Sequence, residues 1–238
     1  RRLLASMGVA GAAVVSGALI PGMGEQVSAN PNRDADENYY RYAGHLPERT
    51  VGDKLREFVS VKDFGAKGDG LTDDREAIQR AIDSLANGGT IYFPDGTYLL
   101  DSVHPQYPKS NLIVRNHAVK LEGAPQFTST LLSATTGTIS VVELPVTVRY
   151  FQMENMRVDG EGSDYNLKAD TEYCPYMSIK NCLFNLAKEC NVKVATYVSI
   201  FEKVIFQLSK TGLHITGLGG SIATAITINS CYANNQSD

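Results

Sequence analysis

A strand-like pattern returns four times in the second half of the chain, and this repeat limits the possible folds more than any other feature. The repeats begin at Phe151, Met177, Val198 and Ile226, which lie 26, 21 and 28 residues apart. Alternate residues in each repeat are apolar and would point to one side of a strand, into a core. Such degenerate repeats predict a solenoid in which every coil, meaning one full turn of the chain, supplies equivalent strands.

An asparagine recurs at one position of the first two repeats. Asn155 and Asn181 occupy equivalent positions in successive repeats, which predicts that their side-chain amides hydrogen-bond along the stack. The third and fourth repeats place Glu202 and Ser230 there, so we expect no continuous asparagine ladder.

Upstream of the repeats, residues 58–100 predict a strand, a loop, a helix and two further strands. Phe58–Val61 alternates as a strand does and leads into the glycine-rich loop Asp63–Gly70. Asp73 is the expected N-cap of an amphipathic helix that ends at Asn87–Gly89. The apolar face of this helix consists of Ala77, Ile78, Ala81, Ile82 and Leu85.

The strands Ile91–Phe93 and Thr97–Leu100 are expected to form a hairpin-like pair around the turn Pro94–Gly96. The first coil of a solenoid would otherwise expose both its apolar core and unpaired strand groups. A short helix with one apolar face is therefore suited to closing that end.

Two segments closely resemble the N-terminal part of proteins of the pectate lyase superfamily: Val59–Asp74 and Gly89–Tyr98. This superfamily includes polygalacturonase-related proteins of glycoside hydrolase family 28 and phage tail appendages. Val158–Gly162 is similar to the Ile-Asp-Gly-x-Gly turn of the polygalacturonase-like members, so the resemblance extends over Val59–Asn235. It implies an all-β fold, a single-stranded right-handed parallel β-helix with a short N-terminal capping α-helix.

We expect three parts along the chain. Residues 1–29 contain the pair Arg1 and Arg2, a mildly hydrophobic run and small residues up to Ala29, which is the order of a twin-arginine-like signal peptide. Residues 30–57 are polar and are predicted to form a linker. Residues 58–238 are predicted to form the β-helix domain, which stops within its last repeat and is expected to be truncated at the C-terminus.

Charge and composition exclude several classes of partner. The net charge is −4 and no Lys/Arg-rich run occurs, so nucleic acid is not an expected partner. No segment has the roughly 18 to 20 apolar residues of a membrane span, and we expect no membrane association after signal cleavage. The expected location is secreted, either extracellular or in the cell wall.

The four cysteines are too few and too widely spaced for a disulfide framework, and we expect core thiols. Cys182 and Cys231 align two coils apart. Two coils correspond to about 9.6 Å, which is beyond the reach of a disulfide. The remaining cysteines are Cys174 and Cys190.

Two chemistries are possible for a polysaccharide-degrading β-helix. Glycoside hydrolysis needs two carboxyl groups about 5 to 10 Å apart and no cofactor, but the motifs that supply them in the polygalacturonase-like family are absent from the matching positions. The pair Asp73–Asp74 is interpreted instead as the start of the capping helix. The alternative is β-elimination of a uronate, in which Ca²⁺ bound to carboxylates acidifies a proton that Arg or Lys removes.

Carboxylates that would line a groove gather in one loop-rich stretch. The candidates are Asp159, Glu161 and Asp164, although Asp beside Gly is also typical of turns. The histidines are scattered along the sequence and indicate no metal cluster. The same region also contains Asp170, Glu172 and the basic residues Arg157, Lys168 and Lys180, to which the sequence assigns no role.

The sequence therefore favours an exported enzyme that degrades an acidic or cell-wall polysaccharide, as a glycosidase or as a polysaccharide lyase. A non-catalytic adhesin or phage tail appendage that binds surface glycans as a homotrimer is the alternative. A third possibility places the catalytic coils beyond Asp238.

Overall fold

The computed structural model describes residues 25–28, 39–42, 49–50, 58–218 and 224–234. The chain divides into two units, Arg1–Glu57 and Phe58–Asp238. In the first unit, β1 (Glu25–Ser28), β2 (Tyr39–Tyr42) and β3 (Arg49–Thr50) form an antiparallel sheet in that order.

The predicted signal peptide and linker fall within this first unit. Residues 1–24 and most of 30–57 lie outside the described residues, so both assignments stay predictions. Within the described ranges, every helix is too short or too polar to span a bilayer.

The second unit consists of three parallel sheets. Sheet 1 contains β4 (Phe58–Ser60), β6 (Gly89–Phe93), β9 (Val119–Gly123), β12 (Gln152–Glu154), β15 (Ser178–Lys180), β18 (Ser199–Glu202) and β21 (Ile226–Asn229). Sheet 2 contains β5 (Asp69–Asp73), β7 (Gly96–Leu100), β10 (Ser129–Ser133), β13 (Met156–Asp159), β16 (Leu183–Asn185), β19 (Ile205–Gln207) and β22 (Tyr232–Asn234). Sheet 3 contains β8 (Ser110–Ile113), β11 (Gly137–Glu143), β14 (Ser163–Ala169), β17 (Cys190–Ala195) and β20 (Thr211–Thr216).

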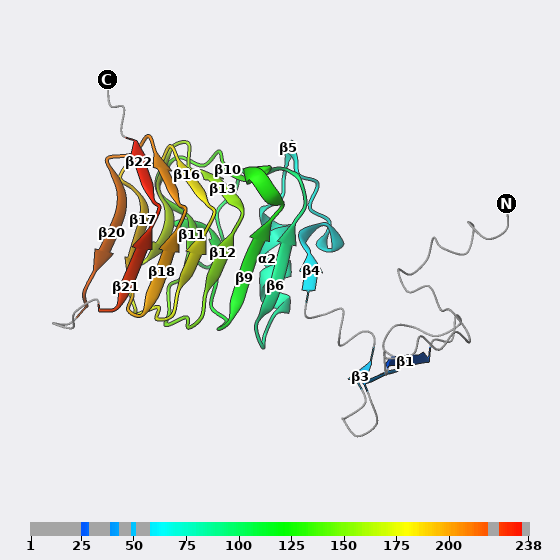
Figure 1. Ribbon diagram of the computed structural model, residues 1–238. Helices are drawn as coiled ribbons and strands as arrows, with labels where there is room; N and C mark the ends of the chain where they lie inside the picture. The colour runs from blue at the N-terminus through cyan, green and yellow to red at the C-terminus, as the bar shows by residue number, and fades with distance from the viewer. Residues whose placement is uncertain (1–24, 29–38, 43–48, 51–57, 219–223, 235–238) are drawn as a thin grey trace. The chain divides into compact units, whose positions relative to one another are not determined.

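Each coil passes through sheets 1, 2 and 3 in turn, and neighbouring strands of a sheet come from successive coils. In sheet 1, for example, Gln152 pairs with Ser178, and Ser178 pairs with Ile200, always in parallel. Figure 1 shows the strands stacked side by side from β4 to β21. The predicted fold class, an all-β right-handed parallel β-helix, is confirmed.

The short helix α2 (Arg75–Ser84) follows the first coil's strands β4 and β5, at the chain position where later coils have a sheet 3 strand. Its apolar face is buried, as predicted. The side-chain amide of Gln79 accepts a hydrogen bond from Ile113 N and donates one to Ile113 O, both at 2.9 Å. Because β8 is the edge strand of sheet 3, Gln79 satisfies backbone groups that a preceding strand would otherwise pair.

Two details of this N-terminal region differ from the prediction. Asp74, not Asp73, precedes the helix, and its carboxylate accepts hydrogen bonds from Lys67 N (2.6 Å) and Gly68 N (2.8 Å). The strands β6 and β7 form no hairpin, because each pairs in parallel with the next coil and they belong to different sheets. Their short connection is a corner of the solenoid.

The described residues also contain two helical turns of the 3-10 type. The first, η2 (Val61–Phe64), begins at Ser60, whose hydroxyl accepts from Lys62 N, and ends at Gly65 with a φ of 96°. The second is η3 (Pro125–Phe127), which connects β9 and β10.

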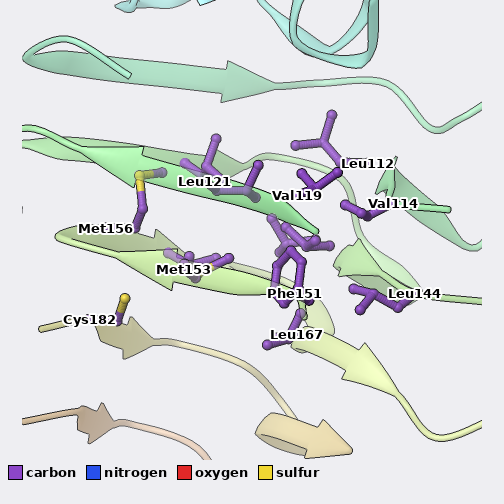
Figure 2. Close-up of a cluster of buried hydrophobic side chains, with 14 of the residues drawn as sticks. Leu112, Val114, Val119, Leu121, Leu144, Phe151, Met153, Met156, Leu167 and Cys182 are labelled. Atoms are coloured by element: carbon purple, nitrogen blue, oxygen red, sulfur yellow. The ribbon is translucent and has the colours of Figure 1, made fainter. Parts of the chain in front are cut away.

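The core is a set of stacked apolar columns, one from each sheet. The sheet 1 column contains Ile91, Leu121, Met153, Ile179 and Phe201, all fully buried. Figure 2 shows Leu121 and Met153 from adjacent strands next to Leu112, Val119, Phe151 and Met156. Burial of each such side chain contributes about 1.5–3 kcal/mol to folding. These columns form one continuous core along the solenoid.

The register of the third repeat differs from the prediction by one residue. Ser199, not Val198, pairs with Ile226, and Phe201 is the inward residue. Val198 and Ile200, which were expected to point inward, are 47% and 40% exposed. The alternation of apolar residues from Val198 resembles a buried strand, but loop length sets the register, and sequence spacing alone does not reveal it.

The corner between sheets 1 and 2 holds the predicted asparagines. Asn155 and Asn181 have φ of 56° and 47°, and the next residues in this stack are Lys203 and Ser230, so the placement of Glu202 there was wrong. Asparagine tolerates this left-handed conformation better than most residues. Backbone bonds connect these corners, such as Asn155 N to Lys180 O at 3.2 Å.

A buried polar ladder does exist, between sheets 2 and 3. Asn166 Nδ2 donates to Asn191 Oδ1 at 2.7 Å, and Asn191 Nδ2 donates to Ser209 Oγ at 2.8 Å. The cysteines are free thiols, and Cys182 and Cys231 are two coils apart in register, as predicted.

Candidate functional site

The predicted candidates Asp159, Glu161 and Asp164 lie along the turn from β13 to β14. Asp159 is buried and binds the guanidinium of Arg157 through both oxygens, with Arg157 Nε 3.0 and 2.8 Å from Oδ1 and Oδ2. Glu161 is exposed and Asp164 is partly exposed. Among the described residues, these three carboxylates form no group placed to hold a metal ion, and their role in lining a groove stays a prediction.

The structure gathers a different set of charges on the outer face of sheet 3. Lys168 Nζ lies 3.3 Å from Glu143 Oε1 and 3.5 Å from Asp170 Oδ1, and Lys193 Nζ lies 2.9 Å from Asp170 Oδ2. We call these four residues the sheet 3 cluster. Lys168 and Asp170 belong to the stretch that the sequence indicated, whereas Glu143 and Lys193 were missed.

Parallel pairing places the cluster in register. Glu143 pairs with Lys168, Lys168 with Lys193, and Lys193 with His214, so one column of ionisable residues crosses four coils. Each column residue stands between two apolar neighbours in the sequence, as Lys168 does between Leu167 and Ala169. A single ionisable residue between apolar neighbours thus recurs at intervals of about one coil. A search of the sequence for this pattern would have identified the column.

The four cluster side chains are only 12–28% exposed, which strengthens their mutual attraction compared with a fully hydrated pair. The hydrogen bond to Asp170 raises the pKa of Lys193 above its ordinary value. Ser110 Oγ donates to Glu143 Oε2. The result is a well-ordered charged surface.

An aromatic ring lies beside the two lysines. The ring centre of Tyr165 is 5.8 Å from Lys168 Nζ and 5.6 Å from Lys193 Nζ, which is cation–π distance. Together, the cluster, Tyr165 and the neighbouring His214 present carboxylates, ammonium groups, a phenol and an imidazole on one face. These groups can bind sugar hydroxyls and carboxylates, and they include proton donors and acceptors.

The arrangement is not that of an open hydrolytic pair. The distances from Lys168 Nζ to Glu143 Oε1 and to Asp170 Oδ1 place these two oxygens at most about 7 Å apart, a limit that includes separations used by glycosidases. The ammonium of Lys168 contacts both of them, at 3.3 and 3.5 Å. It fills the space that the glycosidic oxygen and the attacking water would need.

The residues described do not fit a calcium site. Within residues 58–218 and 224–234, no group of three or more His, Cys, Asp or Glu side chains is placed to hold a metal ion. We derive no step through calcium, and a calcium requirement stays a prediction.

A second polar surface lies on sheet 1. Lys120 Nζ contacts Glu122 Oε2 (2.9 Å) and Glu154 Oε2 (2.8 Å). A hollow of about 100 Å³ beside them is lined mainly by Glu154, Ser178 and Lys180. This hollow has the volume of a few water molecules and is too small for a saccharide ring.

Comparison with known proteins gives one family match. The family described as rhamnogalacturonase A/epimerase, pectate lyase-like matches residues 58–237.

Two curated relatives are similar over part of the chain. Mannuronan C5-epimerase AlgE4 of Azotobacter vinelandii is 32% identical over 126 residues, which is 50% of this chain and 22% of the relative. Plasmin and fibronectin-binding protein A of Streptococcus pneumoniae is 42% identical over 85 residues, or 32% of this chain and 12% of the relative. The chain thus spans less than a quarter of either relative.

Among solved structures, ORF18 of Geobacillus virus E2 has a similar fold, with a TM-score of 0.66 and 19% identity. The match covers 82% of this chain and 43% of that one. At this identity the likeness concerns the fold.

Proposed function

Since this chain belongs to the rhamnogalacturonase A/epimerase, pectate lyase-like family, we propose that it is an extracellular protein that binds an acidic polysaccharide along the outer face of sheet 3 and degrades it. The observation that carries the proposal is the sheet 3 cluster. Its charged column runs along the solenoid axis, so a polymer lying on this face would meet one ionisable group per coil.

β-Elimination of a uronate suits this face better than hydrolysis does. In that reaction a cation stands beside the uronate carboxylate and a base removes the C5 proton. The C4–O glycosidic bond then breaks as the C4–C5 double bond forms, and the leaving oxygen takes a proton from water or from the protonated base. Lys168 and Lys193 supply the positive charge, and exposed His214 follows Lys193 in register, where its imidazole is the candidate base. The position of Lys168 between Glu143 and Asp170 opposes the hydrolytic alternative.

Incubation with polygalacturonate, alginate and teichoic acid, each with and without calcium, tests this proposal. A lyase yields unsaturated products that absorb in the ultraviolet, whereas a glycosidase yields only new reducing ends. We expect Lys193→Gln and His214→Asn to lower product formation at least about tenfold, or about 1.4 kcal/mol in barrier height.

Lys180→Gln is the matched control, because Lys180 is also ion-paired across a coil, to Glu202 at 3.6 Å, but lies on sheet 1. It should leave the rate within about twofold of wild type. Equal losses in control and cluster variants, or full activity in Lys193→Gln, would contradict the placement of the site on sheet 3.

A non-catalytic glycan-binding role is the second candidate. Both lysines of the cluster are paired with carboxylates, an arrangement that holds a rigid binding surface without leaving a free base. In this case polysaccharide would bind, with loss in Lys193→Gln, while no product formed under any condition. A homotrimer, as in an appendage, would appear as three times the chain mass in light scattering.

A further inference from the structure

The corner between sheets 3 and 1 carries a column of residues in the left-handed conformation. Tyr150, Tyr176 and Val198 occupy it, with φ of 60°, 60° and 49°, and Ala118 precedes them at 54°. Backbone hydrogen bonds keep them in register, such as Tyr150 N to Pro175 O at 3.1 Å and Tyr176 N to Tyr197 O at 3.1 Å.

The backbone does not explain why this corner is aromatic. The corner between sheets 1 and 2 has the same left-handed conformation, and there the chain uses Asn155, Asn181, Lys203 and Ser230. Bulky residues are disfavoured at positive φ, so tyrosines at such positions add strain that polar residues would reduce. Leu186 and Leu208 take the same conformation elsewhere, at φ of 63° and 47°, so the exposure and stacking of the two rings, more than the strain, distinguish this corner.

The two tyrosines form an exposed stack. Their ring centres are 4.8 Å apart with an angle of 11° between the planes, and Tyr150 and Tyr176 are 51% and 39% exposed. Tyr197 packs edge-on against Tyr176, which holds that side of the stack in place. Rigid tyrosines that are half exposed offer amphipathic contact area at a low entropic cost.

The stack is open at its Tyr150 end. One face of the Tyr150 ring is covered by Tyr176, and the next residue in the column on the other side is Ala118, whose methyl group leaves the place of a third ring empty. Coils repeat at about 4.8 Å, so the empty place has the thickness of one flat ring.

Two basic residues are the sequence neighbours of the residues that form this empty place. Arg149 directly precedes Tyr150, and His117 directly precedes Ala118. Arg149 N donates a hydrogen bond to His117 Nδ1 at 3.1 Å, and both Arg149 and His117 are exposed. In the described part of the chain, the Arg149 guanidinium makes no ion pair. A guanidinium is suited to bidentate binding of a carboxylate.

We propose that the free face of Tyr150, above Ala118 and beside Arg149, is a stacking site for one pyranose ring of a uronate-containing polysaccharide. The inference rests on the proposed function, because the same polymer would extend here from sheet 3. The loops that lead from the cluster to the tyrosines run together, since Thr171 Oγ1 donates to Pro145 O at 3.1 Å.

Binding measurements on alginate and oligogalacturonate, by affinity electrophoresis and calorimetry, test the site. Tyr150→Ala should weaken binding at least about tenfold, whereas Tyr150→Phe, which keeps the ring, should stay within about twofold of wild type. Ala118→Tyr should also weaken binding, because the new ring occupies the place of the sugar. Arg149→Gln should weaken binding of these acidic polymers and leave binding of a neutral glucan unchanged.

Tyr232→Ala is the matched control, because Tyr232 is 58% exposed on sheet 2 and should not matter. Unchanged circular dichroism and urea midpoints establish that the variants fold. Full affinity in Tyr150→Ala together with loss in Lys193→Gln would overturn this site and leave the proposed function standing. If wild type bound none of the polymers, both proposals would fall. A change in oligomeric state in Tyr150→Ala without a loss of glycan binding would identify the corner as a protein interface and overturn the inference.

Discussion

Replacement of Gly160 by alanine should strongly destabilise the β-helix through one buried contact. Gly160 lies outside the left-handed region, so its backbone alone does not exclude a side chain. A Cβ at this position would lie 2.1 Å from Asn166 Oδ1, and Asn166 is fully buried. Asn166 must therefore move when the methyl group is added.

Moving Asn166 disrupts the polar ladder. Asn166 Nδ2 donates to Asn185 O at 2.9 Å and to Asn191 Oδ1 at 2.7 Å. Each buried hydrogen bond contributes about 0.5–1.5 kcal/mol net, and overpacking adds about 1–3 kcal/mol. We expect Gly160→Ala to lower the free energy of unfolding by about 2–6 kcal/mol, with the upper figure applying if both hydrogen bonds are lost.

Urea denaturation measures this loss of stability. Unfolding is monitored by circular dichroism and by tyrosine fluorescence, since the chain contains 12 tyrosines and no tryptophan. A double-mutant cycle with Asn166→Ala isolates the contact. In the Asn166→Ala background the two nearest atoms, both of Asn166, are removed, and the third nearest is Ser163 Cβ at an ordinary 3.6 Å. The second substitution should then be neutral or stabilising by up to about 1 kcal/mol, because alanine restricts the unfolded chain. An equal cost of Gly160→Ala in both backgrounds would refute the reasoning.

Other regions of the β-helix allow further predictions. Asp74→Ala should lower the urea midpoint, because two backbone N–H groups lose their acceptor, at about 1–3 kcal/mol for each group left buried. Backbone hydrogen bonds from Thr72 and Leu71 lower the pKa of Asp69. The carboxylate therefore stabilises the fold above its unfolded pKa, and this contribution is lost as the pH falls through its folded pKa. In Asp69→Asn the pH dependence of the free energy of unfolding below about pH 4 should weaken. Burial raises the pKa of Cys182 to about 12, so iodoacetamide at pH 8 should label it only after denaturation, as mass spectrometry of the peptide would show. Val198→Asn should raise the thermal midpoint by relieving a left-handed β-branched residue, a gain of about 1 kcal/mol; a lower midpoint would contradict the strain.

The sequence by itself determined the solenoid and its N-terminal cap. Alternating apolar residues and an amphipathic helix are local patterns, because side-chain direction follows from backbone period. The pattern at Met153 and Ile179 thus predicted inward columns correctly, and the isolated thiols followed from coil spacing. The same reasoning located Lys168 and Asp170 in the stretch of candidate site residues without naming their partners.

Only the tertiary structure decided which residues of successive coils lie side by side. The register of Ser199 depends on loops of unequal length. So do the contact of Gln79 with Ile113 and the ion pairs of Lys168 with Glu143 and of Lys193 with Asp170. A one-residue change in a loop moves every following side chain to the opposite face of its strand. The sequence therefore predicts the repeat of the coils. Which residues form the charged column and the tyrosine corner depends on loop conformations, which the local sequence pattern does not determine.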